Sequence, residues 1–124
     1  MRPAPEPVSG AEGAGGLAER IAAIASDRKA EDIRVLEVGD LVGYTDQFVI
    51  CTGNTERHTK AIHDAIYREL KDEGLMPRRV EGDREARWIL MDYLECVIHI
   101  FTPEARGYYR LEQLWGEAPA RAVD

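Results

Sequence analysis

The chain has 124 residues, enough for one domain with a modest core, and its formal net charge is −7 at pH 7. This charge weighs against broad nucleic-acid binding, because neutralisation of phosphates by Lys and Arg dominates the affinity of proteins that bind nucleic acids. No apolar run reaches the roughly 18 residues of a transmembrane helix. We therefore expect a cytoplasmic protein.

Residues 1–16 are built mainly from Pro, Ala, Gly and Glu, and they are predicted to form a disordered N-terminal extension. This segment has no apolar centre, so a secretory signal is not expected. The folded domain is predicted over residues 17–115, and residues 116–124 are predicted to be a frayed tail.

Apolar residues recur at helical spacing between residues 16 and 28, which predicts an amphipathic helix. Two apolar runs over residues 33–38 and 46–52 predict strands. Gly53 and Asn54 then break the pattern, and either Asn54 or Thr55 can cap the helix that follows.

The second helix is predicted to extend to about residue 73, with Gly74 as its C-cap. A short strand is expected over residues 78–81. Thr102 and Pro103 are suited to open a last helix.

Two strand-like runs between Arg87 and Phe101 meet at a tight turn and predict a hairpin. The predicted order is therefore α-β-β-α-β-β-β-α. The first two strands can pair directly, and the helical link after them suits a crossover to a parallel strand. We expect an α/β fold, a mixed five-stranded sheet packed with helices.

The first strand of the hairpin places Trp88, Leu90 and Asp92 on one side, and Tyr93 among the residues on the other. A buried carboxylate without a partner is costly, so this row makes an unusual core. If the face is open, the row is an apolar patch with one acidic group, which is typical of a protein-binding surface. Trp88 as an ordinary core residue remains the alternative.

The charge is uneven along the chain. Between residues 80 and 104 there are six acidic residues and two basic ones. An acidic face attracts basic partners, and ribosomal and histone-like proteins are abundant basic proteins of the cell.

Neither a cofactor nor a metal site is predicted. Cys51 and Cys96 both fall in apolar runs and are expected to be buried, reduced thiols. His58 and His63 are five residues apart, so on a helix they point in different directions. His99 lies within the last hairpin strand, where we expect a structural role and hypothesise that it orients Asp92 or Trp88 across the hairpin.

The sequence offers two enzymatic interpretations, a phosphate-binding loop and a nucleotidyltransferase site. The segment from Thr52 to Thr55 lies between a strand and a helix, as phosphate-binding loops do. Its single glycine is too few for a Walker loop or a dinucleotide fingerprint, and no Gly-Lys-Ser/Thr follows, so an ordinary capped turn is favoured. A nucleotidyltransferase would need two or three carboxylates around a divalent cation. Asp46 and Asp92 are the two candidates, and an Asp-x-Asp pair is missing.

Several segments, taken together in order, resemble the ribosomal silencing factor family, also called the Iojap-related family. The resemblance covers residues 17–115, and its combined spacing is more specific than any one segment. The segments are Asp46–Gly53, Thr55–Ile62, Val80–Gly82, Trp88–Tyr93, Val97–Phe101 and Tyr109–Trp115.

This resemblance implies a fold like that of nucleotidyltransferases without their catalytic residues, and a protein that is not an enzyme. It implies binding to the large ribosomal subunit through large-subunit ribosomal protein fourteen, a small basic protein. Docking there blocks joining of the small subunit and represses translation under nutrient limitation. Some members form homodimers. Organellar relatives take part in large-subunit assembly, so an assembly role remains an alternative.

The family's contact residues carry over onto Trp88, Leu90, Asp92, Tyr93 and Tyr109. One departure lies at the hairpin turn, where the family usually has Gly-Asp and this chain has Leu94-Glu95. If the turn requires a positive φ, Leu94 is expected to be strained by about 1 kcal/mol or more.

Overall fold

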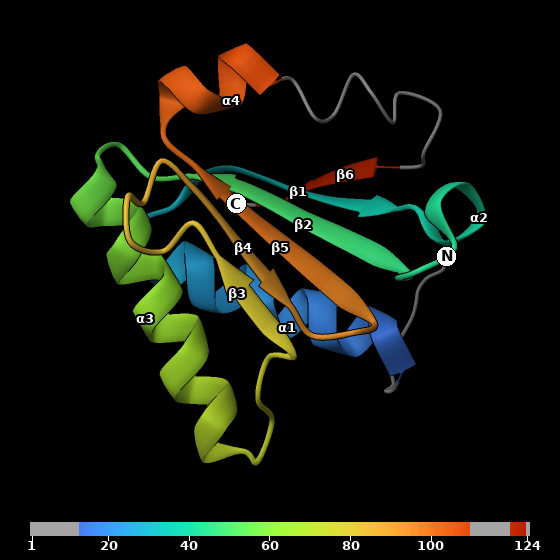
Figure 1. Cartoon of the computed structure of the whole chain (residues 1–124). Coiled ribbons are helices and arrows are strands. Elements are labelled where there is room, and N and C mark those ends of the chain that lie inside the picture. The colour runs from blue at the N-terminus through green and yellow to red at the C-terminus, as the bar shows by residue number, and fades with distance from the viewer. Residues whose placement is uncertain (1–12, 110–119, 124) are drawn as a thin grey trace.

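The structure, a computed structural model, describes residues 13–109 and 120–123. It contains one mixed sheet with helices packed against it (Figure 1). The helices are α1 (Gly13–Asp27), α2 (Gly39–Val42), α3 (Glu56–Asp72) and α4 (Pro103–Tyr109). The strands are β1 (Glu31–Glu37), β2 (Gln47–Thr52), β3 (Arg79–Glu81), β4 (Trp88–Asp92), β5 (Cys96–Phe101) and β6 (Ala120–Val123).

The strands lie in the order β3-β4-β5-β2-β1-β6. The central pair, β2 and β5, is parallel, and every other pair is antiparallel. The direct pairing of β1 with β2 and the helical crossover after β2 were both predicted, and both are confirmed. The mixed α/β architecture is confirmed with them.

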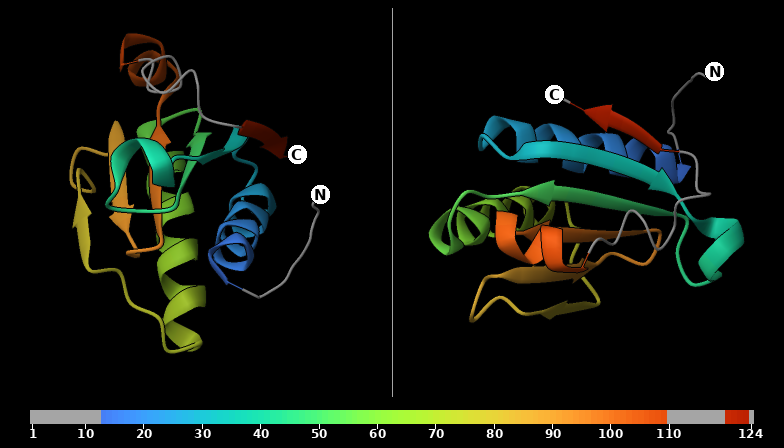
Figure 2. Two further views of the ribbon diagram at one scale, coloured as in Figure 1. Left: turned by 90° about the vertical axis from the view of Figure 1, so that its right-hand side faces the viewer. Right: turned by 90° about the horizontal axis from the view of Figure 1, so that it is seen from above.

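The two faces of the sheet are covered differently (Figure 2). Helices α1 and α3 pack on one face, here called the inner face, and form the larger hydrophobic core with it. Helix α4 lies over the opposite face, here called the outer face. Strand β2 is buried along its whole length, as its continuous apolar run predicted.

The sheet has six strands rather than the predicted five, because Ala120–Val123 pairs antiparallel with β1. The prediction of a frayed tail is therefore wrong for these four residues, since β1 offers an edge whose backbone groups need partners. At the other end, Gly13–Gly16 form the first turn of α1, although they were included in the disordered extension. The predicted disorder of residues 1–12 lies outside the described residues.

Both ends of α3 follow from local sequence. Thr55 caps the N-terminus, and its Oγ1 accepts the backbone N–H of His58 at 3.1 Å. At the C-terminus, Gly74 has φ 88°, and its N–H and that of Leu75 donate to the carbonyls of Lys71 and Leu70. This is a Schellman motif, so the predicted role of Gly74 is confirmed.

Candidate functional site

The predicted row of Trp88, Leu90 and Asp92 follows β4 along the outer face of the sheet. Trp88 and Leu90 are half-buried, and Asp92 is buried, with 9% of its surface exposed. Both apolar residues pack against a second hydrophobic cluster on this face, to which β1, β2, β5 and α4 contribute. The row is thus less open than the sequence suggested, and Trp88 contributes both to the core and to the surface.

The Trp88 side chain is held in one orientation by its neighbours on β5. Its indole Nε1–H donates to Nδ1 of His99 at 3.0 Å. Its ring stacks on Phe101, with ring centroids 5.1 Å apart. The hypothesis that His99 orients a residue across the hairpin is confirmed for Trp88, whereas Asp92 has other partners.

His99 is neutral at physiological pH for a physical reason. Only 4% of the residue is exposed, and desolvation lowers the pKa of the imidazole to about 4. Since Nδ1 accepts from Trp88, the ring proton sits on Nε2, for which the described residues provide no hydrogen-bond partner.

Asp92 shapes the hairpin turn. Its Oδ1 accepts the backbone N–H of Leu94 at 2.8 Å, and its Oδ2 lies 3.9 Å from Nη2 of Arg78. The Glu95 N–H donates to the Tyr93 carbonyl at 2.9 Å, and Leu94 between them has φ 75°. The turn therefore does require a positive φ, the condition under which strain at Leu94 was expected.

Tyr93 does not lie on the same face of the sheet as Trp88, Leu90 and Asp92. It is 4% exposed and belongs to the core of the inner face. Burial raises the pKa of its hydroxyl to about 12, and no partner for its Oη is found among the described residues. Tyr109 is the last residue of α4, and its side chain lies outside the described part of the structure.

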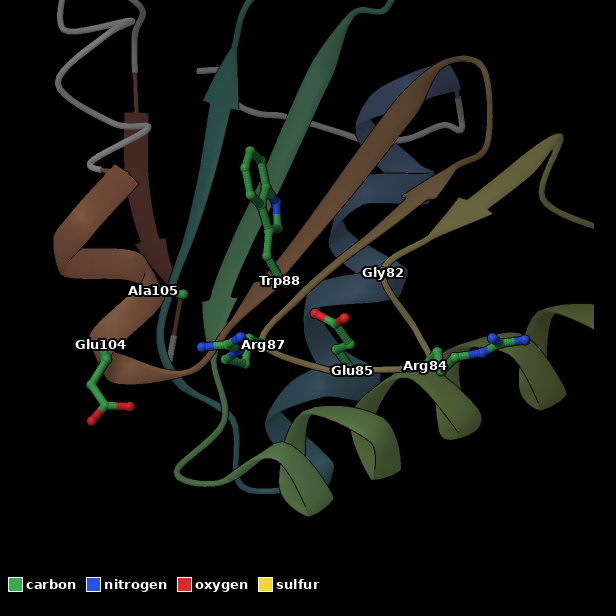
Figure 3. Close-up of a pocket in the computed structure, with 7 residues that line it drawn as sticks. All are labelled: Gly82, Arg84, Glu85, Arg87, Trp88, Glu104 and Ala105. Atoms are coloured by element: carbon green, nitrogen blue, oxygen red, sulfur yellow. The ribbon is translucent and has the colours of Figure 1, made fainter.

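A pocket of about 720 Å³ adjoins Trp88, between the β3–β4 loop and the start of α4. Its apolar wall is formed by Trp88 and Ala105, and its charged rim mixes both signs (Figure 3). In Figure 3, Arg84 points away from the other side chains of the rim. The rim residues with charge are Arg84, Glu85, Arg87 and Glu104.

Helix α4 is anchored on the sheet by Arg106, a residue that the sequence did not single out. Only 9% of Arg106 is exposed. Its Nη1 donates to the Asp32 carbonyl at 2.7 Å and to Thr52 Oγ1 at 2.8 Å. The start of the helix is capped as predicted, with Thr102 Oγ1 accepting the Ala105 N–H at 3.3 Å. These contacts place α4 beside Trp88.

The geometry gives the enzymatic interpretations little support. Asp46 precedes β2 and Asp92 ends β4, and β5 lies between these strands, so the backbones at the two residues are roughly 10 Å apart, given the usual spacing of strands. Among the described residues, no group of three or more His, Cys, Asp or Glu side chains is placed to hold a metal ion. The segment after β2 is an ordinary capped turn, in which the Asn54 N–H donates to His58 Nδ1.

The cysteines lie in the core, as predicted. Cys51 and Cys96 are both free and fully buried. Burial raises the pKa of the Cys51 thiol to about 12 and that of Cys96 as well, so both remain thiols. The described helices are too short or too polar to cross a membrane.

The family model described as "Ribosomal silencing factor during starvation" matches residues 11–124. The chain belongs to this family. The ribosomal silencing factor of Bacillus subtilis is 39% identical over 103 residues, which cover 83% of this chain and 87% of that protein. A crystal structure from Bacillus halodurans has a TM-score of 0.77 at 32% identity and covers 88% of this chain and 99% of its own.

A more distant relative carries a different name. The "Mitochondrial assembly of ribosomal large subunit protein 1" of mouse is 34% identical over 100 residues, which cover 78% of this chain and 44% of that protein. This chain is thus similar both to a bacterial silencing factor and to a mouse protein named for assembly of the mitochondrial large subunit.

Proposed function

We propose that this protein silences ribosomes in the cytoplasm by binding the large subunit through large-subunit ribosomal protein fourteen, which blocks subunit joining and represses translation when nutrients are limiting. The observation that carries the proposal is membership of the ribosomal silencing factor family over residues 11–124. Steric blocking requires only affinity and bulk, so this function involves no catalysis.

The contact surface proposed for the ribosomal protein is the outer face beside β4. Trp88 and Leu90 supply half-buried apolar area, and the pocket beside Trp88 offers room for a side chain of the partner. Aromatic residues held rigidly at the centre of an interface are typical of binding hot spots. The hydrogen bond from Trp88 to His99 fixes the indole before the partner arrives, which reduces the entropic cost of binding.

Asp92 and Tyr93 have supporting roles in this proposal. Asp92 directs Oδ1 into the turn, so Oδ2 is the oxygen available for a Lys or Arg of the partner, in competition with Arg78. Tyr93 is buried on the inner face and would act by holding the end of the hairpin in place. Tyr109, on α4, is proposed as a further contact.

Co-sedimentation with isolated large subunits, small subunits and joined ribosomes tests the proposal. We expect binding to the large subunit alone, and a loss of at least about 2 kcal/mol of binding free energy in Trp88→Ala. Tyr67→Ala is the matched control, because Tyr67 is also a half-buried aromatic but lies on α3, against the opposite face. An unchanged affinity of a folded Trp88→Ala protein would refute the assigned surface.

Assembly of the large subunit is the second candidate, and it is favoured by the name of the mouse relative. Silencing and assembly require the same contact with the large subunit. They differ in when that contact is made and in what it changes. Deletion of the gene separates them: a silencing factor changes translation during starvation, whereas an assembly factor leaves immature large subunits in growing cells. Homodimer formation, which the resemblance implies for some members of the family, is tested on the free protein by sedimentation velocity.

A further inference from the structure

Three apolar side chains stand exposed at the end of the sheet where the β4–β5 turn lies. They are Leu41 of α2, Tyr44 of the loop after it, and Leu94 of the turn, with 44%, 61% and 51% of their surfaces exposed. We call these residues the corner surface. Exposed apolar residues that gather in one place mark interaction sites more often than scattered ones do.

The two segments that carry the corner surface are joined by backbone hydrogen bonds. The N–H groups of Asp46 and Gln47 both donate to the carbonyl of Glu95, at 3.1 and 3.2 Å. The N–H groups of Val38 and Gly39 donate in turn to the carbonyl of Asp46. Helix α2 and the β4–β5 turn therefore lie at the same end of the sheet (Figure 1).

The corner surface is connected to the row along β4 through the buried rings of Phe48 and His99. The Tyr44 ring lies 6.4 Å from that of Phe48, and the Phe48 ring packs edge-on against His99 at 4.8 Å. His99 in turn holds Trp88. A chain of ring contacts across the outer face thus links the exposed Tyr44 to the proposed contact residue.

The charged side chains on the two segments that carry the corner surface are acidic, and Arg78 approaches the turn from a neighbouring segment, beside Asp92. Residues 37–56 contain no Lys or Arg, and neither do residues 88–105. Asp40, Asp46 and Glu95 are exposed carboxylates on the same two segments. This field repels phosphate backbones and anionic lipid surfaces, and attracts cationic side chains.

We infer that the corner surface binds a protein segment that carries Lys or Arg beside apolar side chains, on the same partner that docks along β4. The apolar side chains would cover Leu41, Tyr44 and Leu94, and the cationic groups would meet the surrounding carboxylates. This inference rests on the proposed function and extends its contact surface from one edge of the outer face to the end of the sheet.

Binding of the purified protein to isolated large subunits tests the inference. The double variant Leu41→Ser/Tyr44→Ser is expected to bind about tenfold more weakly than the wild type, as for two contacts of moderate strength in an interface. Met76→Ser is the matched control, because Met76 is 49% exposed but lies beyond the C-terminus of α3. Since all three side chains are exposed, the melting temperatures of the variants should stay close to that of the wild type.

Charge reversal tests the chemistry of the partner separately. Asp40→Lys is expected to slow association and to weaken its dependence on salt, because steering by the acidic field is reduced. Asp72→Lys, at the exposed end of α3, makes the same change in net charge and should have a much smaller effect. Equal effects of both substitutions would show that only the net charge matters and would overturn the inference.

A photo-crosslinking residue in place of Tyr44 identifies what covers the corner. A crosslink to a ribosomal protein is expected, whereas a crosslink to ribosomal RNA overturns the inference. If Trp88→Ala abolishes binding while Leu41→Ser/Tyr44→Ser leaves it unchanged, the inference fails and the proposed function stands. If the wild-type protein does not bind large subunits, the proposed function fails, and the inference fails with it.

Discussion

Trp88 and His99 form a hydrogen-bonded pair across the β4–β5 hairpin, with Trp88 Nε1–H donating to His99 Nδ1 at 3.0 Å. The two residues are diagonal neighbours on adjacent antiparallel strands, since the register pairs Trp88 with Phe101 and Leu90 with His99. Protonation of Nδ1 would remove the acceptor and place a charge in a buried site. The orientation of Trp88 therefore depends on a neutral histidine.

This arrangement predicts that the protein loses stability in mild acid. The pKa of His99 is lowered to about 4 in the folded state, while an unfolded histidine titrates near 6.5. Between these values the unfolded state binds more protons, so the free energy of unfolding falls as the pH drops. We expect a contribution of about 2 kcal/mol to be lost between pH 7 and pH 5, measured by urea denaturation.

The variant His99→Gln isolates this contribution from that of the carboxylates, because Gln does not titrate. Its stability at pH 7 should be lower than that of the wild type, since the imidazole and its hydrogen bond are lost. Its decline between pH 7 and pH 5 should be shallower by about 2 kcal/mol. Parallel pH profiles for the two proteins would contradict the assigned role of burial at His99.

Leu94 gives a second prediction, because it is held at φ 75° in the turn. A glycine adopts this conformation without strain, and Leu94 is 51% exposed, so little packing is lost on substitution. We expect Leu94→Gly to raise the free energy of unfolding by about 0.5–1 kcal/mol, after the greater flexibility of glycine in the unfolded chain is counted. Thermal melting measures the change.

The variant Leu94→Ala separates the effect of backbone strain on stability from the effect of the leucine side chain. Alanine keeps the unfavourable φ and removes the exposed isobutyl group, so no stabilisation is expected. If Leu94→Ala and Leu94→Gly are equally stable, the turn is not strained by its φ.

Much of this architecture could be predicted from the sequence because its signals are local. The capping of α3 by Thr55 depends on residues within one turn of the helix. The alternation along β4 likewise placed Trp88 and Tyr93 on opposite faces, where the structure has them. Such patterns are set by helix and strand geometry and need no knowledge of distant contacts.

Other features depend on contacts that a sequence pattern does not carry. Strand β6 forms because the edge of β1 is available, and nothing in Ala120–Val123 alone distinguishes a strand from a tail. Helix α2 has only four residues, too few for a periodic signal. Asp92 was expected to be an exposed acidic anchor, but its Oδ1 is engaged by the turn that follows it.

Gly82 provides a third prediction, about the close approach of the β3–β4 loop to Trp88. A Cβ at Gly82 would lie 2.0 Å from the Trp88 carbonyl oxygen, and Gly82 has φ 79°. Gly82→Ala must therefore displace the start of β4, and we expect it to cost at least 2 kcal/mol of stability. Gly74→Ala is the matched control, because Gly74 has φ 88° and open space around it. Its cost should be only about 1 kcal/mol, the cost of the φ alone.

If the two glycine variants lose the same stability in thermal or urea denaturation, the contact with Trp88 is relieved without cost. A larger loss in Gly82→Ala, together with weaker binding to large subunits, is the expected pattern, because Trp88 itself would move.

The last prediction concerns Arg106, which joins α4 to the ends of β1 and β2. Arg106→Met keeps a long aliphatic side chain but removes the donors to Thr52 Oγ1 and to the Asp32 carbonyl. Leaving buried acceptors without donors costs about 1–3 kcal/mol, so we expect a loss of about 2 kcal/mol in the free energy of unfolding. By contrast, Asp32→Asn should change stability by less than about 0.5 kcal/mol, because the Asp32 side chain is 52% exposed and its backbone carbonyl is retained. Comparable losses in the two variants would mean that Arg106 acts through its surface ion pair with Asp32 rather than through its buried hydrogen bonds.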